Sequence, residues 1–255
     1  MSIADVAGRA VTSRFATTLM DMLERVEYRR VRLDEQFDPV YRLRYEAYRR
    51  EDGIPINSQQ VARDHLDFTL NAMCYGVYID GELVSSIRLH FATAEHRHSP
   101  CMRMYPELLN GLLDQGHTFI DPSRFTADRE ATLAIPALPF LTLRVAAMAC
   151  EYYVATYCLS GVRDEHAAFY KRVFRSREIA GYSQYPGMTF PVKLYAADVS
   201  DIRNSLMDRF PFFMSTPSER QKMFGPGSDA HYLGLIQPTA RQAALEEDRY
   251  APAAQ

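Results

Sequence analysis

The 255-residue sequence has no tryptophan, no C-x-x-C pair and only four cysteines. The lack of paired cysteines excludes zinc-finger spacings, and four isolated thiols are typical of a reduced, cytoplasmic protein. The most apolar stretch, 133–159, is interrupted by two prolines, an arginine and a glutamate, so it cannot cross a bilayer. The N-terminus carries Asp5 and Arg9 and lacks the apolar run of a secretion signal. We therefore expect a cytoplasmic protein without a transmembrane segment.

An excess of positive charge is also missing. Twenty-nine basic and 32 acidic residues give a net charge of −3, which argues against a nucleic-acid partner. His96 and His98 lack a third ligand at suitable spacing, so no metal site is expected. Cys150 and Cys158 lie in apolar stretches without a neighbouring base, where a thiol is inert.

What the sequence does contain is a regular alternation of strand and helix patterns. Two alternating runs, 75–79 and 82–91, flank Asp80-Gly81, which predicts a hairpin. A helix is expected to begin at Asp38-Pro39. The periodicity predicts further strands at 26–33, 117–126, 157–162, 179–185 and 190–196. It also predicts helices at 139–156 and 165–174. This order predicts one mixed α/β layer with helices on both faces of a single sheet.

Three parts of the chain are distinguished. Residues 1–24 read as a helical N-terminal lead-in, and 25–200 hold the strands and helices of the main domain. Residues 201–255 read as a helical C-terminal extension that ends in a loose tail.

The element order, together with the helix His166–Phe174, resembles the GCN5-like N-acetyltransferase fold. The resemblance implies an α/β (α+β) protein with a central mixed, mostly antiparallel twisted sheet. It also implies that Phe169 and Tyr170 bind substrate by lining the arm of a thioester. Without the resemblance, the aromatic face of this helix reads equally as ordinary core packing.

The segment before the long central helix, 128–139, contains no glycine and carries Asp128 and Glu130. Backbone N–H groups of a glycine-rich loop are the usual cradle for a pyrophosphate. This sequence favours a pantetheine arm presented on a carrier protein over free coenzyme A. The alternative is that a side chain such as Arg129 binds the phosphate.

Three further stretches carry a more specific resemblance. They are Arg42-Leu-Arg44-Tyr45-Glu-Ala-Tyr48 on the first helix, Asp64-His-Leu-Asp67 with the strand end Ser86-Ile-Arg88-Leu89, and Asp121-Pro-Ser123-Arg124-Phe125. In this order they resemble the acyl-homoserine-lactone (autoinducer) synthases and the related long-chain N-acyl amino acid synthases, over about residues 25–200. The autoinducer synthases carry a tryptophan that is missing here, and usually a glutamate where Asp121 stands. The resemblance is therefore closer to the N-acyl amino acid synthases.

Transferred residue by residue, the resemblance implies catalytic roles for Asp67, Asp121 and Arg124, and substrate-binding roles for Arg44, Asp64, Arg88, Phe125 and Thr126. A carboxylate can accept the proton of an attacking amine, and an arginine can bind the carboxylate of a substrate. A bulge near Phe125 and Thr126 would expose amides to an oxyanion. The alternative is that these charges are structural ion pairs that tie the first helix to the sheet.

Two more features concern the acyl donor. A slot for the chain is expected among Ile87, Leu89, Phe125, Leu141, Val145, Met148 and Phe169. Lys171, Arg172 and Arg175 form a basic cluster on which an acidic carrier protein can dock. The alternative is that these basic side chains are simply exposed to solvent at the end of a helix, where positive charge interacts favourably with the helix dipole.

These features predict an N-acyltransferase without a permanently bound cofactor. It moves a long fatty acyl chain from acyl-phosphopantetheine on acyl carrier protein to the α-amine of an amino acid or similar small amine. The alternatives are an acyl-homoserine-lactone synthase and a non-catalytic acyl-binding module of the same fold. The sequence does not identify the amine, the chain length or the oligomeric state.

Overall fold

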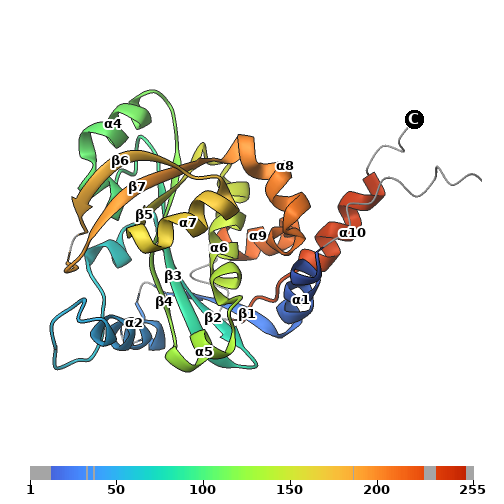
Figure 1. The fold of residues 1–255 in the computed structure, drawn as a ribbon, viewed down its shortest axis with the longest axis horizontal. Helices are drawn as coiled ribbons and strands as arrows, with labels where there is room; N and C mark the ends of the chain where they lie inside the picture. Colours follow the sequence, from blue (N-terminus) through green and yellow to red (C-terminus); the bar gives the residue numbers. More distant parts are fainter. Residues whose placement is uncertain (1–12, 33, 37, 186, 227–233, 251–255) are drawn as a thin grey trace, which may run out of the picture.

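The computed structural model describes residues 13–32, 34–36, 38–185, 187–226 and 234–250. One seven-stranded sheet runs through it in the order β1-β2-β3-β4-β5-β7-β6 (Figure 1). Its strands are β1 Val26–Val31, β2 Ala72–Ile79, β3 Glu82–Ala92, β4 Phe119–Ala127, β5 Tyr157–Val162, β6 Arg177–Gln184 and β7 Pro191–Asp198. Neighbouring strands are antiparallel except β4 and β5, which run parallel. The predicted mixed, mostly antiparallel sheet is confirmed.

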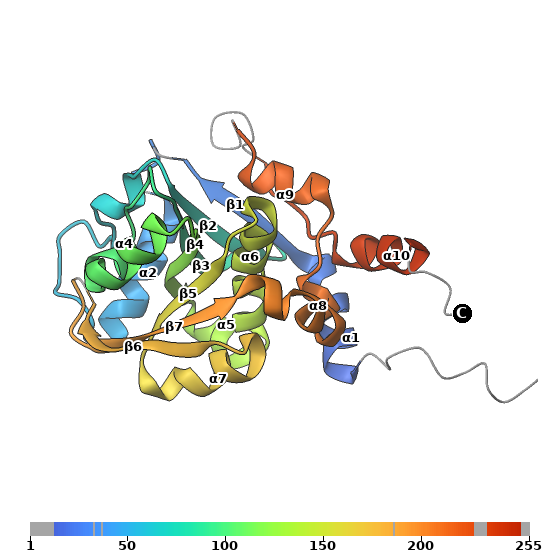
Figure 2. The same ribbon diagram turned by 90° about the horizontal axis from the view of Figure 1, so that it is seen from above.

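Helices cover both faces of this sheet. The α-helices are α1 Arg14–Met22, α2 Pro39–Arg50, α3 Pro100–Met104, α4 Pro106–Asp114, α5 Arg129–Ala134, α6 Leu138–Tyr153, α7 Asp164–Phe174, α8 Val199–Arg209, α9 Pro217–Phe224 and α10 Ala240–Tyr250. The 3-10 turns are η2 Leu23–Arg25, η3 His65–Phe68 and η4 Pro211–Phe213. Figure 2 shows α2 and α4 on one side of the sheet and α6 on the other.

Local sequence explains the predicted elements. Asp80 and Gly81 both have positive φ, 52° and 85°, as the two-residue turn of the β2–β3 hairpin requires. Asp38 caps α2 by accepting a hydrogen bond from the Val40 amide, and Pro39 occupies the first turn. The helices α3 and α4, which begin at Pro100 and Pro106, were not predicted. Both prolines occupy the first turn of their helix, where their missing N–H costs nothing.

Alternation along β3 separates two kinds of side chain. Ile87 and Leu89 point toward α6 and are fully buried in the main hydrophobic core. Arg88 and His90 therefore point to the other face, toward η3. The face under α6 is apolar, and the face under α2 carries buried charge.

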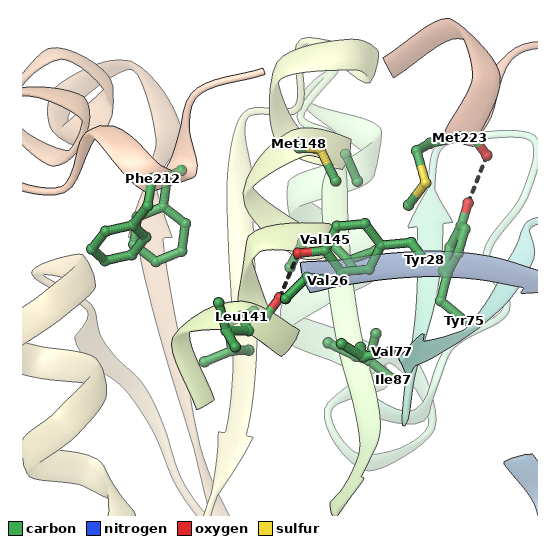
Figure 3. Packing of buried hydrophobic residues seen from close by; sticks show 14 of the residues in the cluster. Val26, Tyr28, Tyr75, Val77, Ile87, Leu141, Val145, Met148, Phe212 and Met223 are labelled. Atoms are coloured by element: carbon green, nitrogen blue, oxygen red, sulfur yellow. Dashed lines mark hydrogen bonds between the residues drawn. The ribbon is translucent and has the colours of Figure 1, made fainter. Parts of the chain in front are cut away.

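The core between the sheet and α6 is closed by two tyrosines. The Tyr28 hydroxyl donates to the Leu141 carbonyl at 2.9 Å, and the Tyr75 hydroxyl donates to the Met223 carbonyl at 2.8 Å (Figure 3). Ile87, Leu89, Leu141, Val145 and Met148, expected to line an acyl slot, are fully buried here and pack on other core side chains.

Segments from both ends of the chain join this core. Leu19 of α1, Phe212 of η4 and Ile236 all belong to it. Arg144 of α6 forms a fully buried ion pair with Glu219 of α9, 2.5 Å from Nη1 to Oε1. Several predictions lie outside the described residues: positions 1–12 of the lead-in, residue 33 at the end of the first strand, and positions 251–255 of the tail.

Candidate active site

Five charged side chains meet on the face of the sheet under α2. We call Arg44, Asp64, Asp67, Arg88 and Arg124 the Arg–Asp cluster. They come from α2, from the turn η3 and from strands β3 and β4. The side chains of Arg44, Asp67 and Arg88 are completely buried, and that of Asp64 is 27% exposed.

The two aspartates are fixed by the backbone of η3. Asp64 precedes the turn and accepts from the Leu66 amide, while Asp67 accepts from the Asp64 amide at 2.8 Å. This reciprocal arrangement is a capping box, which satisfies the amides at the start of the turn. The spacing Asp-x-x-Asp thus orients both carboxylates toward the sheet.

Each arginine pairs with one or both of these carboxylates. Arg44 Nη1 lies 2.7 Å from Asp67 Oδ1, and Arg88 Nη1 lies 2.7 Å from Asp64 and 3.1 Å from Asp67. Arg124 Nη2 lies 2.5 Å from Asp64 Oδ2. Arg88 also donates from Nε to the Ser123 hydroxyl at 3.0 Å. The structure therefore joins Arg124 in one ion-pair network with four other predicted site residues, namely Arg44, Asp64, Asp67 and Arg88.

Arg124 joins this network through an irregularity in β4. Ser86 pairs with Thr126 but Arg88 pairs with Ser123, so Arg124 and Phe125 together lie opposite one residue of β3. Arg124 has φ of 52°, a left-handed conformation that a residue with a side chain seldom adopts. The bulge expected near Phe125 is present, and it turns Arg124 to the same face as Arg88.

The charges of the cluster set its protonation. Burial raises the pKa of Asp64, but Arg88 and Arg124 outweigh it and hold that pKa below its ordinary value. Burial likewise opposes ionisation of Asp67, and Arg44 and Arg88 outweigh it. Both carboxylates are ionised at neutral pH, and three guanidinium groups face them. The cluster by itself carries one excess positive charge.

Asp121 lies nearby on β4, and over the described residues it forms no ion pair with the arginines of the cluster. It is fully buried, and its carboxylate accepts from the Cys101 amide at 2.8 Å and from the Cys101 thiol at 3.1 Å. Burial raises the pKa of Asp121 above its ordinary value, although Arg88 acts against that rise. This carboxylate therefore binds a proton more readily than a solvated aspartate does.

Phe125 and Thr126 lie on either side of the sheet after the bulge. Phe125 packs against the core under α6. The Thr126 hydroxyl shares a hydrogen bond of 2.7 Å with Ser86. Because a bulge removes a residue from the ladder, it leaves main-chain groups of Arg124 and Phe125 without a regular strand partner.

Beyond the bulge lies a gap between two strands. β4 and β5 pair at Phe119–Tyr157 and Ile120–Cys158, and over the described residues the pairing ends there. Residues 121–127 of β4 thus face the side of β5 without a ladder. The Arg–Asp cluster lies at this edge on one face of the sheet.

An apolar cavity of about 50 Å³ lies on the opposite face, between α6, α7 and α8. Its lining includes Pro122, Leu143, Ala146, Ala147, Cys150, Cys158, Tyr170, Phe174, Leu206 and Met207. Tyr170 therefore lies at a cavity, whereas Phe169 packs against Phe140 at a ring distance of 5.2 Å. The lining of α6 is a different stripe of that helix from Leu141, Val145 and Met148.

Lys171, Arg172 and Arg175 are exposed at the end of α7. Lys171 lies over the Tyr195 ring at 5.2 Å, and the Arg172 carbonyl accepts from Arg209. Arg175 lines a second, open groove of about 550 Å³ on the α4 side, together with Arg177. The basic surface thus continues from α7 onto β6.

Sequence reasoning missed several neighbours of the cluster. The Arg124 guanidinium lies over the rings of Tyr48, at 5.4 Å, and Tyr185, at 5.8 Å. Tyr48 ends the first stretch of the resemblance and lies one turn after Arg44 on the same helix, but it was not predicted as a site residue. Tyr185 follows β6, and nothing in the local sequence links it to Arg124.

Over the described ranges, no three His, Cys, Asp or Glu side chains are grouped so as to hold a metal ion. The helices of these same ranges are too short or too polar to cross a bilayer.

Comparison with known proteins agrees with this architecture. The family profile described as "N-acyl amino acid synthase FeeM" matches residues 39–198, more than half of the chain. No curated protein sequence matches significantly.

Solved structures give the fold. The structure of FeeM, an N-acyl amino acid synthase from uncultured soil microbes, superposes with a TM-score of 0.58 at 16% identity. That match covers 73% of this chain and 99% of FeeM. The coenzyme A-dependent acyl-homoserine lactone synthase BjaI gives 0.50 at 11% identity, over 72% and 89% of the two chains. The AHL synthase LasI gives 0.48 at 16% identity, over 67% and 88%. With its matching profile and its GNAT-like fold, this chain belongs to the FeeM family of N-acyl amino acid synthases, which are acyltransferases.

Proposed function

We propose that this acyltransferase moves a long-chain fatty acyl group from acyl carrier protein to the α-amine of a free amino acid. The observation that carries the proposal is the excess positive charge of the Arg–Asp cluster beside the gap between β4 and β5. Three buried arginines face two ionised aspartates there. An acceptor that brings its own carboxylate supplies the missing negative charge.

The two faces of the sheet suit the two substrates. The apolar cavity under α6 and α7 gives part of an acyl chain a dry environment, while the charged face under α2 suits a polar acceptor. The ladder between β4 and β5 ends at Ile120 and Cys158, which leaves their continuations unpaired between the two faces. A thioester carbonyl held in that gap meets an amine from the cluster side.

The reaction follows from these positions. The amine nitrogen attacks the thioester carbonyl carbon, a C–N bond forms, and the C–S bond breaks with release of the pantetheine thiolate. Main-chain amides of the bulge at Arg124 and Phe125 stabilise the intermediate oxyanion. We assign Asp121, with its raised pKa, as acceptor of the amine proton, directly or through a water, and the thiolate takes up a proton on release.

The helix starts near the gap favour a carrier-borne donor over free coenzyme A. The Asp128 carboxylate accepts from the Ala131 amide and occupies the N-terminus of α5. At the start of α6, the Leu138 and Phe140 amides donate to Ile135 and Ala137, and Pro139 has no N–H. A pyrophosphate would find few main-chain donors there and a repelling carboxylate.

The carrier would dock on the exposed basic side chains of α7. Lys171, Arg172 and Arg175 offer positive charge to an acidic partner. All four cysteines are free thiols, which suits our inference that the reaction takes place in the cytoplasm.

The test is product identification. The purified chain is incubated with carrier protein loaded with a long acyl chain and with pooled amino acids, and products are read by mass spectrometry. A new N-acyl amino acid supports the proposal. A homoserine lactone formed from added S-adenosylmethionine, or tight acyl binding without turnover, overturns it.

A further inference from the structure

The connection between β6 and β7 brings a tyrosine onto the Arg–Asp cluster. Tyr185 is 9% exposed, and its ring centroid lies 5.8 Å from the guanidinium carbon of Arg124. The ring of Tyr48 lies 5.4 Å from the same carbon, so two aromatic rings flank Arg124. Met188, from the same connection, accepts a weak hydrogen bond from Arg124 Nη1 at 3.8 Å.

Several buried donors at this place lack a hydrogen-bond partner within the described part of the chain. Three of them are the Tyr185 hydroxyl, Nη2 of Arg88 and Nε of Arg124, and Nε and Nη2 of Arg44 are two more in the same cluster. Leaving such a group buried and unpaired is unfavourable, so several together are unusual in a packed interior. The first three can all donate, and two of them carry positive charge. The group that satisfies them is an anion with several acceptor sites.

The phenol and the two arginines act on one another. Burial raises the pKa of Tyr185, and the charges of Arg88 and Arg124 lower it in part. Both charges therefore lie near the hydroxyl, which stays protonated and able to donate at neutral pH. Asp64 already occupies Nη1 of Arg88 and Nη2 of Arg124. Of these two side chains, Nη2 of Arg88 and Nε of Arg124 are the donors left without a partner.

We propose that Tyr185 Oη, Arg88 Nη2 and Arg124 Nε together bind the α-carboxylate of the acceptor amino acid. This inference rests on the proposed function and adds the residue that distinguishes an amino acid from a simple amine. A carboxylate offers two oxygens with about four acceptor positions, enough for all three donors. Bound there, its α-amine lies toward the gap between β4 and β5.

The variant Tyr185→Phe removes one donor and keeps the ring against Arg124. With carrier-borne acyl donor, we expect KM for the preferred amino acid to rise about 10- to 100-fold, the loss of one charge-assisted hydrogen bond. The kcat should change less than about threefold. The corresponding amino acid amide, which lacks the charge, should show an unchanged KM, so the preference for acid over amide collapses.

Tyr182→Phe is the matched control. Tyr182 lies on the same hairpin, is 61% exposed and donates to Asp164, so its variant should keep the wild-type acid-to-amide preference. Melting temperatures of both variants report any effect on folding.

The possible outcomes distinguish a failure of the carboxylate subsite from a failure of the proposed function. If the wild type forms no N-acyl amino acid, the proposed function fails. If it does, and Tyr185→Phe retains the wild-type preference or loses activity equally toward acid and amide, the carboxylate subsite is wrong while the proposed function stands.

Discussion

The guanidinium of Arg124 donates to the carboxylate of Asp64 at 2.5 Å, across 60 residues of sequence. The contact exists because a bulge gives Arg124 a left-handed backbone and a capping box fixes Asp64. The ion pair thus links the bulge in β4 to the turn η3, beside the gap between β4 and β5.

Asp67→Asn should destabilise the fold strongly. Its carboxylate has no exposed surface and pairs with Arg44 and Arg88, so the variant leaves two buried guanidinium groups short of a counter-charge. Breaking a buried pair in this way costs about 3–5 kcal/mol. Denaturant unfolding measures the change. Asp52→Asn, whose partner Arg49 is 3.7 Å away at the surface, is the control and should unfold like the wild type. A small effect at Asp67 would contradict the buried ion-pair network.

His90 should make the protein lose stability in mild acid. Burial, aided by Arg88, lowers the pKa of His90 to about 3, whereas an unfolded histidine titrates near 6.5. Below pH 6.5 the unfolded chain binds a proton at His90 that the folded chain does not bind. The contribution of His90 to the free energy of unfolding is therefore complete above pH 6.5 and is lost as the pH decreases toward 3. Between pH 7.5 and 5 this amounts to about 2 kcal/mol.

Denaturant unfolding across that pH range checks the prediction. The aspartates of the cluster have lowered pKa values, so their contribution is lost only below their unfolded value of 3.8. His90→Gln should flatten the slope, and the exposed His65→Gln should retain it. An equal slope in wild type and His90→Gln would rule out this assignment.

Ala147→Leu should shift the enzyme toward shorter acyl chains. Ala147 lines the cavity and is only partly buried, so three added carbons fill space without displacing the main core. Relative rates with carrier protein loaded with chains of different length measure the shift, expected at about tenfold for the longest substrates. Ala134→Leu adds the same atoms on the exposed side of α5 and should leave the chain-length profile unchanged. An unchanged chain-length profile in Ala147→Leu would contradict the proposal that the acyl chain occupies this cavity.

Reversing charge at Arg172 and Arg175 should weaken the use of carrier-borne donor. Both side chains are exposed, and long-range attraction to an acidic partner falls with salt. We expect kcat/KM for acyl carrier protein to fall at least tenfold at low ionic strength, with a weaker salt dependence. Arg14→Glu on α1 is the control. Wild-type rates at every salt concentration would place the docking surface elsewhere.

The sequence predicted the frame of the fold because its signals are local. An Asp-Gly pair between alternating runs specifies a hairpin, and Asp38-Pro39 specifies a helix start, whatever the rest of the chain does. The short helices that begin at Pro100 and Pro106 were not predicted, since a proline marks a helix start only when the turn that follows is known to be helical.

The candidate site was predicted only in part. The charged residues were found through their resemblance to a family, and the structure unites Arg44, Asp64, Asp67, Arg88 and Arg124. The residues expected to line an acyl slot pack in the core, and the cavity is lined by another stripe of α6. Because α6 is apolar almost all round, sequence alone cannot tell which stripe faces a cavity. Tyr185 and Cys101 were missed because their contacts depend on how distant elements pack.

The donor is the most direct test of the account. The same long acyl group is presented on carrier protein and on coenzyme A, with one amino acid acceptor, and kcat/KM is compared. Because few main-chain donors are free at the starts of α5 and α6, we expect a preference for the carrier of at least about 100-fold. Equal or better use of the coenzyme A thioester would contradict it.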